Sequence, residues 1–173
     1  MARLYCGMPL VAFSSLPDDA RVWVFGSADE LSAESESALL FAVDGYLEDW
    51  RAHGSPLTVA RDWRDRRFLA IAVDQRDEHA SGCSLDALFR VLRDLETRLG
   101  TSILGNSRVY FRGQDGSVQV TDRSGFAEQA QEGSIGAESR VFDLSVPTAG
   151  EWRSRFEVDA AESWHRGLLP IAV

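Results

Sequence analysis

Two side chains in this sequence, a cysteine and a histidine, are of the types that form catalytic pairs. Cys83 lies in the segment SGCSLD, residues 81–86, which opens a predicted amphipathic helix. Whether Cys83 or Ser84 caps this helix, the free N–H groups and the dipole of a helix N-terminus favour a thiolate. Asp86 acts against this, because it can complete a capping box and its carboxylate repels a thiolate nearby. The simpler interpretation of Cys83 is a small buried residue beside the cap.

His165, in the segment AESWH near the C-terminus, is the second candidate. A histidine acts as a general base when one group orients it and a nucleophile lies within hydrogen-bond reach. Asp159 or Glu162 could orient the imidazole, and Cys83 could be its target if the C-terminal segment covers the start of the helix. The simpler interpretation is a Trp164–His165 pair that anchors the C-terminal segment, with the imidazole bonded to a backbone carbonyl.

A group of carboxylates is the third candidate. Asp74 ends an unbroken apolar run, and Asp77, Glu78 and Asp86 lie close to it in the sequence. Clustered carboxylate oxygens could hold magnesium or calcium. A chain so rich in acids forms such clusters by chance, so we expect a solvated loop and no metal.

The segment DWRDRR, residues 62–67, is the fourth candidate. Arginines interleaved with a tryptophan, here Trp63, Arg64 and Arg67, can bind a phosphate or stack on a base. The two aspartates of the segment and the net charge of −9 oppose this. We therefore expect an ion-paired hairpin tip or a protein contact, and Trp164 near the C-terminus could serve a protein contact in the same way.

The charge balance excludes several classes of function. All 18 basic residues are arginine, and 27 acids give the net charge of −9, which disfavours binding to nucleic acid or to an anionic membrane. Because the chain has no lysine, it has neither a P-loop nor a Schiff-base lysine. The acid-rich, lysine-free composition fits a GC-rich genome, and it also fits adaptation to a salty cytoplasm, where an acidic surface keeps proteins soluble.

The sequence predicts a soluble cytoplasmic protein. No apolar run approaches the roughly 18 residues of a membrane span, and the N-terminal segment MARLYCGMPLVAF lacks a signal-peptide cleavage site. Two cysteines are too few for a disulfide framework or a cysteine zinc site, so we expect reduced thiols. No cofactor is predicted.

Hydrophobic periodicity and turn residues predict the elements that must position these side chains. Ser32 and Ser124 are the predicted N-caps of the first and last helices. The predicted strands are residues 21–25, 57–61, 67–74, 109–112, 117–121 and 140–146, and the predicted helices are 33–53, 85–99 and 125–131. The strand at 67–74 is apolar at nearly every position, which is typical of a central strand covered on both faces.

This order of elements predicts one α+β domain over residues 1–173, in which two main helices pack on one side of a largely antiparallel sheet. Residues 1–16 read as a loose lead-in. Residues 151–173 read as a C-terminal tail that docks on the domain, because Trp152, Phe156 and Trp164 lie close together near the terminus.

Several phrases together resemble a known family. They are LPDDARVWVF, HGSPL, RFLAIAVD with SGCSLD, and AESWH. With them the chain is similar, over most of its length, to a family of small uncharacterised bacterial proteins sometimes labelled "ABC transporter ATPase". The resemblance implies a stand-alone single domain and brings no established activity. The ATPase label does not fit the residues, because the phosphate-cradling loop and its lysine are missing.

Two hypotheses for function follow. The first is a non-enzymatic domain that self-associates or binds a protein partner through exposed Trp and Arg side chains. The alternative is a small enzyme or ligand-binding protein with its pocket at the C-terminal end of the central strand, around Asp74, Cys83, Asp86 and His165. We expect the first, because no catalytic constellation is complete within the sequence.

Overall fold

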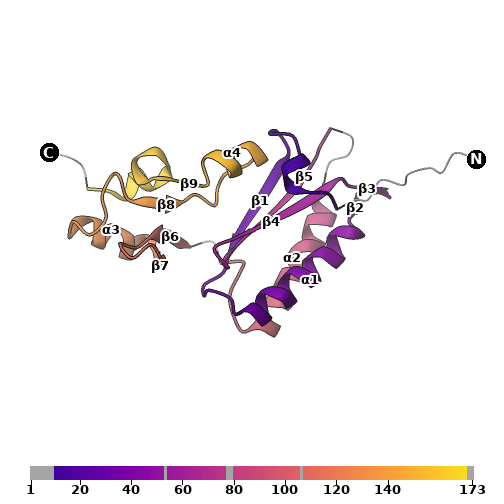
Figure 1. The fold of residues 1–173 in the computed structure, drawn as a ribbon, viewed down its shortest axis with the longest axis horizontal. Helices are drawn as coiled ribbons and strands as arrows, with labels where there is room; N and C mark the ends of the chain where they lie inside the picture. Colours follow the sequence, from indigo (N-terminus) through magenta and orange to yellow (C-terminus); the bar gives the residue numbers. More distant parts are fainter. Residues whose placement is uncertain (1–9, 53, 77–79, 106, 171–173) are drawn as a thin grey trace, which may run out of the picture.

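The computed structural model describes residues 10–52, 54–76, 80–105 and 107–170. Helices and antiparallel sheets together confirm the predicted α+β class. The strands divide between two main sheets rather than forming one (Figure 1). Most of the segment that the sequence suggests to be a loose lead-in, and the last three residues, lie outside the described part of the chain.

The first sheet has three strands in the order β1-β5-β4, all antiparallel to their neighbours. They are β1 (Arg21–Gly26), β4 (Val59–Arg64) and β5 (Phe68–Val73). Every residue of β5 is buried. Leu69, Ile71 and Val73 face one hydrophobic cluster, and the alternate residues face a second cluster on the other side of the sheet. This two-sided burial explains why β5 is apolar throughout.

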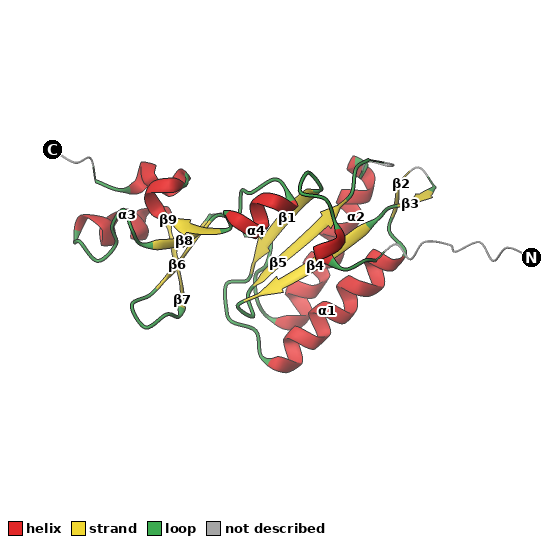
Figure 2. Ribbon diagram, turned by 45° about the horizontal axis from the view of Figure 1, so that its top comes forward, coloured by secondary structure: helices red, strands yellow, loops and turns green. Residues whose placement is uncertain are grey.

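Two helices cover one face of this sheet (Figure 2). They are α1 (Ala33–Glu48) and α2 (Gly82–Leu99). Ser32 caps α1 as predicted, accepting the Ser35 N–H, and Gly100 ends α2 in the left-handed conformation that favours glycine. Helix α1 is shorter than predicted because β2 (Arg51–Ala52) turns back to pair with β3 (Ser55–Pro56). His53, the predicted end of this helix, lies outside the described residues.

The second main sheet has four strands in the order β7-β6-β8-β9. They are β6 (Arg108–Arg112), β7 (Val118–Asp122), β8 (Arg140–Phe142) and β9 (Glu157–Asp159). Strand β8 ends earlier than predicted, because Asp143 accepts the Ser145 N–H in a turn and the Pro147 carbonyl then bonds Val22 of β1.

Short helices complete the second half of the chain. They are α3 (Arg123–Gln131), α4 (Ala149–Ser154) and the 3-10 segments η2 (Ala160–Glu162) and η3 (Trp164–Leu168), with η1 (Phe13–Ser15) near the start. Asp122, not the predicted Ser124, caps α3 by accepting the Gly125 N–H at 2.8 Å. None of the helices in the described ranges has the length and apolarity that crossing a membrane requires.

Aromatic side chains fill the junction between the two sheets. Phe68 of β5 contacts Tyr110, Phe142 and Phe156, with ring centroids 4.7–5.1 Å apart. Trp152 of α4 lies 4.0 Å from Phe156, and both side chains are buried. Trp152 and Phe156 therefore help to hold the four-stranded sheet against the face of the three-stranded sheet that the two helices leave uncovered.

Candidate functional site

Cys83 and Asp86 lie exposed in the first turn of α2. The predicted cap is corrected, because Ser81 caps this helix and accepts the Ser84 N–H at 3.2 Å. Cys83 is therefore an exposed side chain of the first turn, not a buried residue beside the cap.

Asp74 directly follows β5 and is only 8% exposed. Its carboxylate forms an ion pair with Arg76 at 2.6 Å. The Arg76 hydrogen bonds hold the pKa of this carboxyl below its usual range. Asp77, Glu78 and His79 lie outside the described residues. In the described part of the chain, no three His, Cys, Asp or Glu side chains are grouped to hold a metal ion.

His165 is completely buried in η3. Its Nδ1 lies 2.7 Å from the Ser163 hydroxyl, and its Nε2 has no hydrogen-bond partner among the described residues. Burial lowers the pKa of the imidazole to about 4, so the ring is neutral at neutral pH. The bond to Ser163 replaces the carboxylate or backbone carbonyl that the sequence suggests, and Asp159 pairs with Arg140 instead.

The structure does not bring Cys83 and His165 together. The Phe126 ring lies 5.7 Å from the imidazole and belongs to the cluster of the four-stranded sheet, whereas the first turn of α2 packs on the helical core. The yellow C-terminal segment and the start of α2 lie toward opposite ends of the molecule (Figure 1). The pair therefore does not form the hypothesised Cys-His arrangement.

The residues of the β4–β5 hairpin make internal contacts. The Arg64 guanidinium lies 4.3 Å from the centre of the Trp152 ring and bonds Asp62 at 3.0 Å, while Trp63 packs against the helical core. Arg67 is 8% exposed and donates to the carbonyls of Ser27 (3.1 Å) and Ala28 (2.6 Å). These side chains fasten the hairpin to its neighbours.

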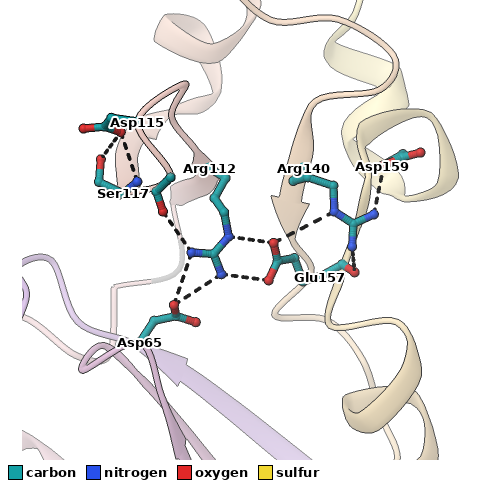
Figure 3. A network of polar contacts seen from close by, with 8 residues as sticks. Asp65, Arg112, Asp115, Ser117, Arg140, Glu157 and Asp159 are labelled. Carbon is teal, nitrogen blue, oxygen red and sulfur yellow. Dashed lines mark hydrogen bonds and ion pairs between the residues drawn. The ribbon is translucent and has the colours of Figure 1, made fainter.

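A polar network joins this hairpin to the four-stranded sheet (Figure 3). Arg112 of β6 binds Glu157 of β9 through two bonds of 2.7 and 2.8 Å, and it reaches Asp65 of the hairpin at 3.2 Å. Arg140 approaches the same Glu157 carboxylate at 3.9 Å and pairs with Asp159. The hydrogen bonds from Arg112 lower the pKa of Glu157. The network fixes how the two sheets meet.

Beside this junction lies a cavity of about 660 Å³, which we call the arginine pocket. Its apolar wall includes Phe25 of β1, Phe89 of α2 and Leu104 of the following loop. Its charged wall is formed by Arg108, which begins β6, and Arg123, which begins α3. The pocket draws its lining from both halves of the chain.

The two arginines of the pocket are held in place without carboxylates. The Arg108 guanidinium lies against Gly105, where an added methyl carbon would meet it at 2.6 Å, and it is 3.4 Å from the Gly26 carbonyl. The Arg123 guanidinium lies 4.9 Å from the centre of the Trp164 ring, which also lines the pocket. Within the described ranges, neither arginine forms an ion pair.

A third arginine adds positive charge behind the pocket wall. The Tyr110 hydroxyl donates to the Gly26 carbonyl at 2.7 Å. Burial raises the pKa of this phenol, and the nearby Arg108 and Arg67 charges lower it by less. Arg67 is buried, its Nε lacks a hydrogen-bond partner, and it has no ion pair with a described residue. The pocket is thus electropositive in a chain whose net charge is −9.

Sequence reasoning missed Arg108 and Arg123, which flank the predicted hairpin. In the β6–β7 register, the backbone of Arg108 lies opposite that of Asp122. Arg123 is the next residue after Asp122. Counting residues outward from the Gln114-Asp115-Gly116 turn would have placed the two arginines side by side. Their shared location at the end of one hairpin was the available signal. No such signal in the sequence indicated that β1 and α2 form the apolar wall of this pocket.

Compared with protein-family models, curated proteins and solved structures, the chain gives no match. The family resemblance described above therefore stays an expectation.

Proposed function

We propose that this protein is a non-enzymatic binding protein that holds a small organic molecule in the arginine pocket. The observation that carries the proposal is a cavity of about 660 Å³ with an apolar wall and two unpaired arginines among the described residues. Ligand sites have this make-up, mostly apolar with a few polar groups, and volumes of roughly 300–1,000 Å³. The proposal moves the ligand-binding alternative from the end of β5 to this pocket.

Binding rather than catalysis is proposed because of how the candidate groups are placed. His165 is buried with its Nδ1 facing Ser163, and Cys83 lies exposed on the far side of the helical core. Ser145 lines the pocket, but its hydroxyl bonds Asp143, a carboxylate, rather than an imidazole base. A nucleophile needs such a base within hydrogen-bond reach.

The test is a fluorescence titration with N-phenylnaphthylamine, a neutral apolar probe. We expect saturable binding to one site, because the wall of Phe25 and Phe89 excludes water from the probe. Replacing Phe89 by serine should raise the Kd by roughly tenfold or more, since one lost aromatic contact is worth roughly 1.5–3 kcal/mol. Phe41→Ser is the matched control, because Phe41 is 83% exposed on α1 and does not line the pocket. No binding to the unmodified protein, or equal effects of the two substitutions, contradicts the proposal.

Self-association remains the second candidate function. It is favoured by the outer face of α1, where Phe41 is 83% exposed and Gly45, one turn later, leaves room for a second copy to approach. Sedimentation of the purified protein tests it: we expect a dimer that Phe41→Ser converts to monomer. A monomer at every concentration excludes it. The net charge of −9 disfavours nucleic acid and anionic membrane as partners, and we also propose a cytoplasmic location.

A further inference from the structure

We infer that the ligand of the arginine pocket is an organic oxyanion: a carboxylate, sulfonate or phosphate group attached to an apolar, ring-containing body. The inference rests on the proposed function, because it specifies the chemistry of the molecule that the pocket holds.

The first argument is the distribution of ion pairs. Acids outnumber bases by 27 to 18 in this chain, so an arginine has many carboxylates available to it. Among the described residues, the arginines that form ion pairs are Arg61, Arg64, Arg66, Arg76, Arg112, Arg140 and Arg153. Arg108 and Arg123, which line the pocket, form none with a described residue, and neither does the buried Arg67. The Arg108 and Arg123 guanidiniums at the pocket wall are therefore not neutralised by an ion pair with a described residue, and their charge is available to an anionic ligand.

The second argument is the burial of Arg67. A buried guanidinium is normally paired with a carboxylate, because an unpaired charge loses its hydration without compensation. Arg67 is only 8% exposed and bonds only carbonyl oxygens. Its positive charge, with that of Arg108, acts on the buried Tyr110 phenol. An anion in the cavity, whose wall includes the Gly26 that Tyr110 bonds, would partly offset this charge, because the protein interior screens charges less than water does.

The third argument is the shape of the charged wall. A guanidinium presents a planar fork of N–H donors that matches the two oxygens of a carboxylate, sulfonate or phosphate. Arg108 and Arg123 supply two such forks from the adjoining ends of one hairpin. The Arg123 fork lies over the Trp164 ring, which is stacked on the buried His165 and so holds the guanidinium against a fixed surface. Phe25 and Phe89 then face the apolar part of the ligand.

Two probes that share one ring system test the inference. N-phenylnaphthylamine is neutral, and anilinonaphthalenesulfonate carries a sulfonate on the same rings. We expect Arg123→Gln and Arg108→Gln each to weaken sulfonate binding by roughly tenfold or more, since bonds to charged groups are worth about 1.5–3 kcal/mol. Binding of the neutral probe should change less than about twofold. Arg93→Gln, on the exposed face of α2, makes the same charge change and should affect neither probe.

A glycine substitution tests whether the position of the Arg108 guanidinium matters when its charge is kept. Gly105→Ala puts a methyl group where the Arg108 guanidinium now lies, and the flexible side chain must move away. This variant keeps every charge, yet it should weaken sulfonate binding several-fold. Gly136→Ala meets nothing within 4 Å and is the control.

The outcomes distinguish the two proposals. If the neutral probe binds and the arginine variants do not selectively weaken binding of the sulfonate probe, the oxyanion inference is overturned and the pocket proposal stands. Failure of both probes to bind the unmodified protein overturns the pocket proposal and the inference together. If the two glutamine variants weaken binding of the sulfonate probe alone, both the pocket proposal and the oxyanion inference are supported.

Discussion

At the scale of single residues, burial decides what His165 can do. The imidazole is fully buried beside Phe126 and Trp164, and the desolvation of its charged form lowers its pKa to about 4. The charge of Asp143 opposes this shift and that of Arg123 adds to it, both by less than the burial. A histidine that stays neutral over most of the physiological range is a packing residue here, and the AESWH segment alone did not show this.

We therefore predict that His165 makes stability depend on pH. In the unfolded chain the imidazole binds a proton near pH 6.5, but in the folded chain only near pH 4. Between these values the unfolded state holds more protons, so the free energy of unfolding falls as the pH falls, by up to about 3 kcal/mol. Urea unfolding of the unmodified protein and of His165→Gln from pH 7 to 4 measures it. Parallel curves for the two proteins would contradict the pKa assignment.

At the scale of elements, local signals predicted what local chemistry decides. Ser32 caps α1 because its hydroxyl accepts an N–H three residues later, and Gly100 ends α2 because its φ is positive. The apolar run of β5 correctly indicated burial on both faces. The misplaced cap at Ser124 has a simple cause: Asp122 reaches the helix first from the end of β7. Asp122 and Ser124 are both suitable cap residues, and the position at which β7 ends decides which of them caps the helix.

The network around Arg112 gives an element-level prediction. Glu157→Gln removes the charged partner that two Arg112 bonds require, and we expect the free energy of unfolding at pH 7 to fall by about 1–2 kcal/mol. Arg112 lowers the pKa of the Glu157 carboxyl, so its contribution is present above the unfolded pKa near 4.3 and is lost as the pH falls through the folded value. Urea unfolding of the unmodified protein and of Glu157→Gln, at pH 7 and at pH 3, measures this difference.

The same experiment carries its own control. Glu138→Gln, at an exposed loop position with no ion pair to a described residue, should leave the unfolding free energy within about 0.5 kcal/mol. A Glu157→Gln variant as stable as Glu138→Gln at pH 7 would show that the network does not stabilise the junction.

At the scale of the whole molecule, contacts between distant segments make the pocket. Phe25 comes from β1 and Phe89 from α2, whereas Arg108, Arg123 and Trp164 come from β6, α3 and η3. No periodicity in the sequence records which face of one sheet meets the other. The α+β class could therefore be predicted, whereas the separation into two sheets and the pocket between them could not.

The junction predicts the effect of removing one aromatic side chain. Trp152 is fully buried, contacts the Phe156 ring and donates its indole N–H to Asp62 at 2.8 Å. Trp152→Ala should lower the free energy of unfolding by roughly 3–5 kcal/mol, as measured by urea unfolding. Trp164→Ala is the control, because that side chain is 38% exposed and should cost much less. Equal losses would mean that the C-terminal segment is not packed as described.

The net charge gives a second prediction at this scale. A charge of −9 repels itself in the folded protein, and molar potassium chloride screens this repulsion. The Tm should rise by several degrees as the salt concentration increases. A constant or falling Tm would favour the GC-rich interpretation of the composition over adaptation to salt.

The most direct test of the central claim is a crystal structure of the protein with anilinonaphthalenesulfonate. We predict that the rings lie against Phe25 and Phe89 and that the sulfonate lies within hydrogen-bond distance of Arg108 and Arg123. The probe bound elsewhere on the surface, or bound in the pocket with its sulfonate turned away from both arginines, would contradict it.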